Sequence, residues 1–120
     1  MNTESKYSSI HYNTYLQVDK ITSAQTLRSD EVGLHAHDEM LFIITHQVYE
    51  LWFKQINFEL KSVLNDFSAR QINEKNVGIA VSRLHRIIEI MKLLIQQISV
   101  METMTPLDFL DFRNYLFPAS

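Results

Sequence analysis

Apolar residues recur at alternating steps of four and three residues along two long stretches of the chain. The first stretch, residues 37–67, contains neither Gly nor Pro, and Asp38 and Glu39 stand where carboxylates favour the start of a helix. Its repeating positions are Phe42, His46, Tyr49, Phe53, Ile56, Leu60, Val63 and Phe67. The spacing predicts one long helix over residues 37–67 that packs along these positions.

The second stretch repeats this spacing after a polar connection over residues 68–76. Its positions are Val77, Val81, Leu84, Ile88, Met91, Ile95 and Ile98. We predict a second helix over residues 76–102, and the short connection predicts that the two helices form an antiparallel hairpin. Because Ile87, Ile90 and Leu94 widen the apolar face, we expect further helices, from this chain or another, to cover it.

Shorter segments precede the hairpin. Residues 1–9 are polar and Ser-rich and are predicted to be disordered. Residues 10–22 carry an amphipathic pattern and are predicted to form a short helix. Residues 26–34 lack a period and are predicted to be a loop.

A well-marked helix start follows the hairpin. Thr105 is a suitable N-cap, Pro106 suits the first helical position, and Asp108 stands three residues after the cap. These signals predict a short helix over residues 105–117. The fold class expected for residues 1–120 is therefore all-α and bundle-like, a long antiparallel helical hairpin with short flanking helices in a single region.

Composition excludes several classes of protein. The chain is 46% hydrophobic with a net charge of −3 and has no run of basic residues, which argues against binding to nucleic acid or to an anionic membrane. No apolar run approaches the roughly 18 residues of a membrane span. The absence of Cys excludes disulfides and thiolate metal sites and fits a reducing compartment, so we expect a cytoplasmic protein. The sequence also contains no phosphate-binding Gly loop and no nucleophile elbow.

Two residues are the main candidates for ligand binding, and each has two interpretations. His46 is either a core histidine bonded to a nearby group or an imidazole that faces a ligand and accepts an N–H or a proton. Arg113 lies on an aromatic and aliphatic helix face. It either pairs with Asp108 or Asp111 or binds a substrate carboxylate through its planar guanidinium.

Two further pairs of residues also allow two interpretations. Tyr12 and Tyr15 share one face of the predicted helix over residues 10–22, where they either pack with their hydroxyls at the surface or line a pocket for a planar ligand. His35 and His37 could bind a metal ion only in extended backbone, and otherwise they are solvated side chains next to a helix start.

The segment HDEMLFIITHQVYELWFKQINFEL resembles the signature of the tryptophan 2,3-dioxygenase family, haem enzymes of the kynurenine pathway. The resemblance extends upstream to YNTYL, from Tyr12 to Leu16, and downstream to METMTPLDFLDFRNYLFPAS, so it covers nearly the whole chain from Tyr12. It implies haem-dependent oxidation of L-tryptophan by O2 to N-formylkynurenine, with haem b and its iron as the cofactor.

The resemblance also implies roles for individual residues. Phe42 and His46 match residues that flank the indole, with His46 facing the indole N–H as the candidate catalytic residue. Arg113 matches the arginine that binds the substrate carboxylate. Phe109 and Leu116 match apolar neighbours of that site.

Other matches point to the cofactor and to a second subunit. Ser120 matches a residue near the haem and the ammonium end of the substrate, and Tyr12 is expected near the cofactor as well. Tyr12, Tyr15 and Leu16 match residues that complete the pocket of an adjacent subunit, which implies a homo-oligomer, expected to be a tetramer. Phe117 departs from the small residue expected at its position.

The family's proximal haem histidine and its next motif, Gly-Phe-Gln-Ser, would follow Ser120. We therefore expect the 120 residues to be the N-terminal part of a subunit that supplies the substrate-recognition half. Alone, they would neither ligate haem properly nor turn over substrate, and we expect no metal ligand among them. The alternative is a non-catalytic helical module whose wide apolar faces serve self-association.

Overall fold

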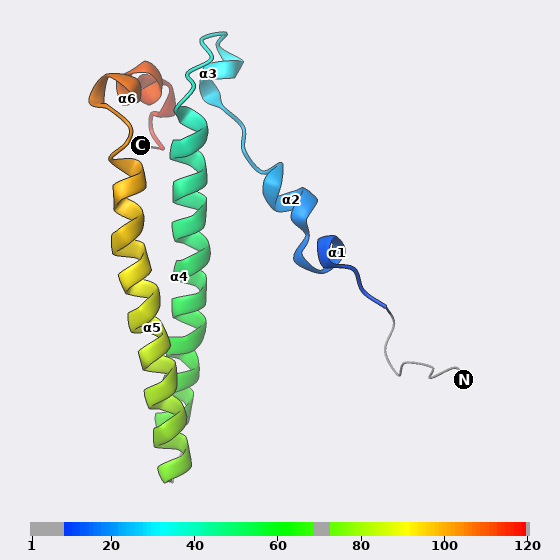
Figure 1. Cartoon of the computed structure of the whole chain (residues 1–120), viewed down its shortest axis with the longest axis vertical. Helices are drawn as coiled ribbons and strands as arrows, with labels where there is room; N and C mark the ends of the chain where they lie inside the picture. Colours follow the sequence, from blue (N-terminus) through cyan, green and yellow to red (C-terminus); the bar gives the residue numbers. More distant parts are fainter. Residues whose placement is uncertain (1–8, 69–72, 120) are drawn as a thin grey trace.

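A long helical hairpin dominates the structure, a computed structural model that describes residues 9–68 and 73–119 (Figure 1). Helix α4 (Glu39–Phe67) and helix α5 (Glu74–Met101) lie side by side in opposite directions along most of their length. Every regular element within the described residues is a helix. The prediction of an all-α fold built on a long antiparallel hairpin is confirmed.

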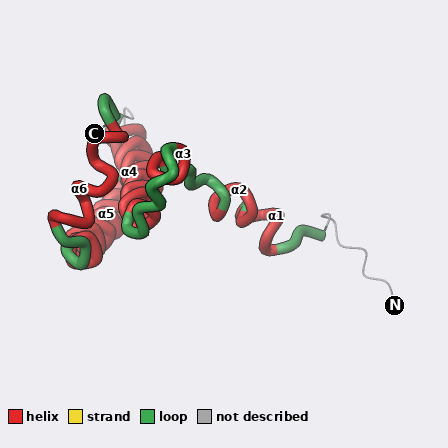
Figure 2. Tube along the Cα trace, turned by 90° about the horizontal axis from the view of Figure 1, so that it is seen from above, coloured by secondary structure: helices red, strands yellow, loops and turns green. Residues whose placement is uncertain are grey.

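The shorter elements lie at one end of this hairpin or to one side of it (Figure 1). They are α1 (Tyr12–Leu16), α2 (Val18–Thr22), α3 (Arg28–Glu31), α6 (Pro106–Arg113) and the 3-10 helix η1 (Asn114–Leu116). Helices α3 and α6 gather at the end where α4 begins and α5 finishes, whereas α1 and α2 lead away from the hairpin (Figures 1 and 2). Most of the disorder predicted for residues 1–9, and the cofactor role of Ser120, lie outside the described residues.

The single helix predicted over residues 10–22 is instead two short helices. Gln17, between α1 and α2, adopts a left-handed backbone with φ 54° and ψ 45°, and its N–H donates to the carbonyls of Asn13 and Thr14. That conformation ends α1 in the way a C-terminal Gly often does. The prediction was wrong here because Gln gives no sequence signal for a left-handed residue.

The predicted loop over residues 26–34 contains the single turn α3. Its first N–H groups have no carbonyl partners inside so short a helix. The Glu39 carboxylate acts as their acceptor instead, and it accepts from the backbone N–H of Arg28 at 2.7 Å and from that of Ser29 at 2.8 Å. The turn therefore depends on a residue outside the segment, which local periodicity does not indicate.

The last predicted helix, over residues 105–117, is divided. Helix α6 ends at Arg113 and tightens into η1, and Phe117 is extended with φ −63° and ψ 134°. Pro118 accounts for the extended backbone of Phe117, because a residue before proline is pushed out of the helical region.

The face along which α4 and α5 meet differs from the predicted one. On α4, the buried or partly buried positions at alternating steps of four and three residues from Thr45 are Thr45, Tyr49, Trp52, Ile56, Glu59, Val63 and Asp66. On α5, they include Ala80, Arg83, Ile87, Ile90, Leu94, Gln97 and Met101. We call these two sets the contact face. Only Tyr49, Ile56 and Val63 of the predicted α4 positions belong to it, and none of the predicted α5 positions does.

Polar pairs explain why apolar periodicity misplaced the contact face. The buried carboxylate of Glu59 accepts from the Arg86 guanidinium at 2.7 Å. Arg83 donates to the Ser62 hydroxyl at 2.7 Å and to Asp66 at 3.3 Å. A search for apolar positions passes over such residues, although pairing lets them occupy a helix interface.

The predicted α5 positions form a second apolar surface instead. These residues, Val77, Val81, Leu84, Ile88, Met91, Ile95 and Ile98, are between 39% and 69% exposed, and we call them the exposed stripe. The buried core is small and consists of Ile56, Ile87 and Ile90, with Trp52 and Leu94 packed against it.

Within the described residues, no helix combines the length and hydropathy needed to cross a bilayer.

Candidate functional site

The candidate site lies at the end of the hairpin where α6 and η1 stand next to the first turns of α4 (Figure 1). Helix α4 supplies Phe42 and His46, α6 supplies Phe109 and Arg113, and η1 supplies Leu116. These segments are far apart in the sequence. The fold therefore brings together the two parts of the chain that contain the main candidate residues.

An aromatic cluster joins α4 to α6. The ring centroid of Phe42 lies 5.7 Å from that of Phe109 and 5.3 Å from that of Phe112, and Phe109 meets Phe112 edge to face at 5.5 Å. Phe112 is fully buried. These distances are those of stabilising aromatic pairs, so the cluster fixes α6 against the start of α4.

His46 extends this cluster along α4. Its ring centroid lies 4.2 Å from that of Phe42, and its Nδ1 lies 2.7 Å from the Phe42 carbonyl oxygen. A carbonyl oxygen only accepts, so Nδ1 carries the proton and Nε2 of the neutral ring is left as an acceptor. The side chain is exposed rather than part of the core, which leaves Nε2 able to accept an N–H from a ligand.

Arg113 stands at the other side of the cluster. Its guanidinium carbon lies 6.0 Å from the Phe109 ring centroid, close to the limit for a cation–π contact. Among the described residues Arg113 forms no ion pair, so the interpretation in which it pairs with Asp108 or Asp111 does not hold here. The exposed guanidinium is available for an anionic group such as a carboxylate.

Asp108 caps α6 instead of binding Arg113. Thr105 and Asp108 form a capping box, in which the Asp108 N–H donates to the Thr105 hydroxyl at 3.2 Å and the Thr105 N–H donates to the Asp108 carboxylate at 3.2 Å. The Thr105 hydroxyl also donates to that carboxylate, at 2.7 Å. The two bonds to the carboxylate lower the pKa of Asp108 below its ordinary value, with a smaller contribution from Asp38. The cap sets where α6 begins and so where Phe109 and Arg113 lie.

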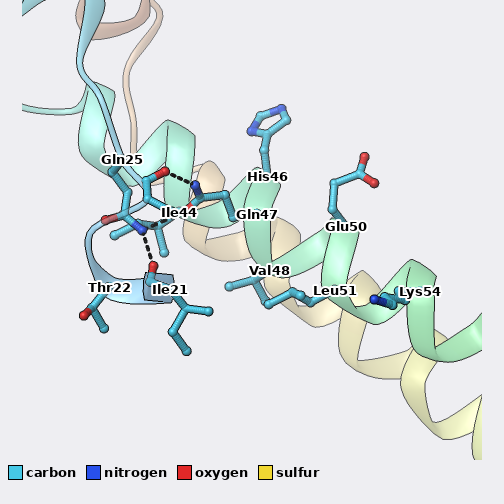
Figure 3. Close-up of a pocket in the computed structure, with 11 residues that line it drawn as sticks. Ile21, Thr22, Gln25, Ile44, His46, Gln47, Val48, Glu50, Leu51 and Lys54 are labelled. Atoms are coloured by element: carbon cyan, nitrogen blue, oxygen red, sulfur yellow. Dashed lines mark hydrogen bonds between the residues drawn. The ribbon is translucent and has the colours of Figure 1, made fainter. Parts of the chain in front are cut away.

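An open pocket of about 830 Å³ lies between α2 and α4 (Figure 3). His46 lines it, and its imidazole projects from the same side of α4 as Glu50. The side chain of Gln47 donates to the Ala24 carbonyl at 2.6 Å and fastens the segment after α2 to α4. Arg113 does not line this pocket, so His46 and Arg113 are joined through the aromatic cluster and not through this cavity.

The remaining predicted residues fall into two groups. Leu116 is partly buried on η1, beside the cluster. Tyr12, Tyr15 and Leu16 lie on α1, which leads away from the hairpin, and they are exposed by 74%, 69% and 42% (Figure 2). The structure thus brings Phe42, His46, Phe109, Arg113 and Leu116 to one end of the hairpin and leaves the α1 residues outside this site.

Two residues that position the site were not predicted. Phe112 stands three residues after Phe109, and its contact with both Phe109 and Phe42 makes it the centre of the cluster. An aromatic residue at this helical spacing was the only local sign of its role. Glu39 was interpreted as a favourable charge at a helix start, whereas the structure buries it completely as the partner of α3.

The described residues do not form an enclosed haem site. Haem iron needs an axial ligand such as a histidine, and the apolar macrocycle needs walls on both faces. All five histidines, His11, His35, His37, His46 and His85, are exposed. His35 bonds to Asp30 at 2.8 Å, and among the described residues no group of three or more His, Cys, Asp or Glu side chains could hold a metal ion.

Comparison with known proteins gives a consistent result. The family model described as Tryptophan 2,3-dioxygenase matches residues 1–120. A curated tryptophan 2,3-dioxygenase from Bdellovibrio bacteriovorus is 57% identical over 115 residues, which are 96% of this chain and 32% of that protein. One from Alteromonas mediterranea is 54% identical over 110 residues, 92% of this chain and 30% of that protein. Tryptophan 2,3-dioxygenase B from Danio rerio is 56% identical over 112 residues, 92% of this chain and 28% of that protein. The chain spans about a third of the length of these relatives.

Proposed function

Because this chain belongs to the tryptophan 2,3-dioxygenase family, we propose that it recognises L-tryptophan as the substrate of a dioxygenase. The proposed overall reaction consumes L-tryptophan and O2, breaks the indole C2–C3 bond and leaves one oxygen atom on each carbon, giving N-formylkynurenine. The family resemblance implies that haem, when bound, activates O2. Since the described residues form no enclosed haem site, we derive no step through haem and propose only the part that these residues play.

That part is recognition of the two ends of the substrate and of the ring between them. The supporting observation is the continuous series His46, Phe42, Phe109, Arg113, whose successive separations are 4.2, 5.7 and 6.0 Å. L-tryptophan presents an N–H, a flat apolar ring and a carboxylate. An acceptor nitrogen, two phenyl faces and a guanidinium complement these groups in the same order.

His46 holds the indole end in this proposal. With Nδ1 donating to the Phe42 carbonyl, Nε2 accepts the indole N–H and fixes the rotation of the ring. Nε2 is also placed to take the proton of the indole N–H if that proton is released. Phe42 and Phe109 then exclude water from the faces of the indole.

Arg113 holds the amino acid end. Its two-pronged guanidinium matches a carboxylate in a way that a lysine ammonium does not.

For a neighbouring subunit we propose that Tyr12, Tyr15 and Leu16, which are exposed on α1, complete its pocket in a homo-oligomer. The resemblance also leads us to propose cofactor-binding roles for Tyr12 and Ser120.

The contribution of Arg113 can be measured with two ligands. L-tryptophan carries the carboxylate, whereas tryptamine has the same indole and ammonium without it. Because hydrogen bonds to charged groups contribute about 1.5–3 kcal/mol, Arg113→Ala should weaken L-tryptophan binding by roughly tenfold to a hundredfold and leave tryptamine binding unchanged. Calorimetric titration of the 120-residue chain gives both affinities.

Arg113→Lys serves as the matched control, because it keeps the charge and removes the planar fork. We expect it to recover only part of the lost affinity. If Arg113→Ala bound L-tryptophan as tightly as the unsubstituted chain, the assignment of the carboxylate to Arg113 would be wrong.

A second function, self-association through the exposed stripe, is favoured by the seven apolar side chains that α5 leaves uncovered. It is compatible with substrate recognition, since a homo-oligomer is part of the first proposal. A measurement of the mass in solution tests it separately.

A further inference from the structure

Glu39 is a fully buried carboxylate at the first residue of α4, among the elements that carry the candidate site. Both of its oxygens are used, because Oε2 accepts from the backbone N–H of Arg28 and Oε1 accepts from that of Ser29. A buried carboxylate is costly unless such bonds compensate it. Glu39 therefore holds α3 in one place against the start of α4.

Ser29 extends this connection through the turn after α3. It is fully buried, its hydroxyl accepts from the N–H of Ala36 at 3.0 Å, and its carbonyl accepts from the N–H of Leu34 at 2.8 Å. The backbone from α3 to the start of α4 is thus fixed at both ends. The two bonds from its N–H groups to the Glu39 carboxylate therefore contribute to its position.

Arg28 carries the connection to the other half of the site. Its backbone N–H is bonded to Glu39, and its side-chain Nε donates to the Tyr115 carbonyl of η1 at 3.3 Å. The same side chain forms an ion pair with Glu31, which orients the guanidinium. Tyr115 stands two residues after Arg113, so this bond holds the segment that immediately follows Arg113.

The first turns of α4 carry Phe42, about one turn beyond Glu39, and His46, about two turns beyond it. One carboxylate therefore links the helix that binds the indole end to the segment that binds the carboxylate end. We propose that Glu39 is a positioning residue: through Arg28 it sets the place of Arg113 relative to His46. This inference rests on the proposed recognition of L-tryptophan.

The test compares the affinities of the 120-residue chain for L-tryptophan and tryptamine. Glu39→Gln keeps the size of the side chain but places an NH2 group opposite a backbone N–H. One of the two hydrogen bonds from Arg28 and Ser29 to residue 39 is therefore lost. Arg28→Ala leaves the bonds from the backbone N–H groups to Glu39 in place and removes the donor to Tyr115 together with the exposed ion pair to Glu31. Glu89→Gln, an exposed glutamate on α5 paired with Lys92, makes the same charge change away from the site.

We expect Glu39→Gln and Arg28→Ala to weaken L-tryptophan binding by about threefold to tenfold, the range expected for the loss of one hydrogen bond. Tryptamine affinity should change by less than about twofold, because tryptamine does not use Arg113. Glu89→Gln should change neither affinity. If circular dichroism shows that Glu39→Gln is unfolded, Arg28→Ala alone decides the result, since Arg28 is exposed and its removal leaves Glu39 paired.

Two results would overturn the positioning role. One is an equal loss of affinity for both ligands, which would mean a general structural effect, and the other is no loss for either ligand. These results are separable from failure of the proposed function. If Arg113→Ala retained the preference for L-tryptophan over tryptamine, or if the chain bound neither ligand, the recognition proposal itself would fail and this inference with it.

Discussion

At the scale of single residues, hydrogen bonds to the backbone decide what the candidate side chains can do. The sequence left His46 as either a core residue or a ligand-facing one, and the structure combines parts of both interpretations. The ring is bonded to the Phe42 carbonyl, as a core histidine would be, yet it is exposed. The choice of tautomer follows from that bond, which no sequence pattern could reveal because it requires the χ angles of one side chain.

The pKa of Asp108 gives a prediction at this scale. The hydrogen bond from the Thr105 side chain is the largest cause that lowers this pKa below 3.8, followed by the bond from the Thr105 backbone. Thr105→Ala removes the first bond and keeps the second, so the pKa of Asp108 should rise only part of the way toward 3.8. A carbon-detected NMR titration of the Asp108 carboxyl measures it, with Asp111→Asn as a control on the same helix.

The sign of the pH dependence follows from the direction of this shift. Because the folded pKa of Asp108 is lowered, the folded state binds fewer protons, and the cap's contribution to stability is fully present above the unfolded pKa. That contribution is lost as the pH falls below about 4 and through the lowered folded pKa. An identical loss of α6 structure on acidification in the original chain and in Thr105→Ala would contradict this role.

At the scale of elements, the sequence specified the two long helices better than the face on which they meet. Absence of Gly and Pro and a sustained period are local properties, so α4 and α5 could be predicted. The contact face could not, because Glu59 and Asp66 occupy it only when Arg86 and Arg83 stand opposite. For the same reason, neither α3 nor the role of Phe112 could be predicted. The N–H groups of α3 have their acceptor in Glu39, and Phe112 has its partner, Phe42, on another helix.

Two adjacent isoleucines on α5 test the revised contact face. Ile87 is 5% exposed and belongs to the core, whereas Ile88 is 49% exposed and lies on the exposed stripe. Truncation of a buried isoleucine leaves a cavity as well as losing apolar burial, so Ile87→Ala should lower the free energy of unfolding by about 2–5 kcal/mol. Ile88→Ala should lower it by less than about 1 kcal/mol.

Urea unfolding followed by circular dichroism compares these variants directly. The two substitutions remove the same atoms from the same helix, so helix propensity cancels between them. The measurement should be made where the midpoint does not depend on protein concentration, so that association does not contribute. If Ile88→Ala lowered the free energy of unfolding by more than Ile87→Ala, the face predicted from the apolar period would be the correct one.

At the scale of the whole molecule, the chain is extended and its core is small. The Cα radius of gyration is 20.7 Å, and the principal extents are 57, 45 and 24 Å. A compact domain of about 100 residues has a radius near 13 Å, so this chain buries much less surface than a globular domain of its length. The resemblance to the tryptophan 2,3-dioxygenase family is confirmed, and it depended on residue identity and not on packing.

The exposed stripe leads to a prediction about assembly. Seven large apolar side chains lie exposed at helical spacing along α5, and burying them against a second copy removes this surface from water. We therefore expect the 120-residue chain to self-associate at micromolar concentration. Size-exclusion chromatography with light scattering should give a mass that is a multiple of 14.1 kDa.

A charge placed on the stripe separates this association from general aggregation. Ile95→Lys puts an ammonium at the most exposed of the seven positions, where it remains solvated in the single chain but would be buried between copies. We expect the mass to fall toward 14.1 kDa while the helical content stays unchanged. Glu89→Lys, on the same helix but outside the stripe, should leave the mass as it was. Because the stripe is apolar, the association should also persist at high salt, so an unsubstituted chain that is monomeric, or that dissociates as salt is raised, would contradict the proposed role of this surface.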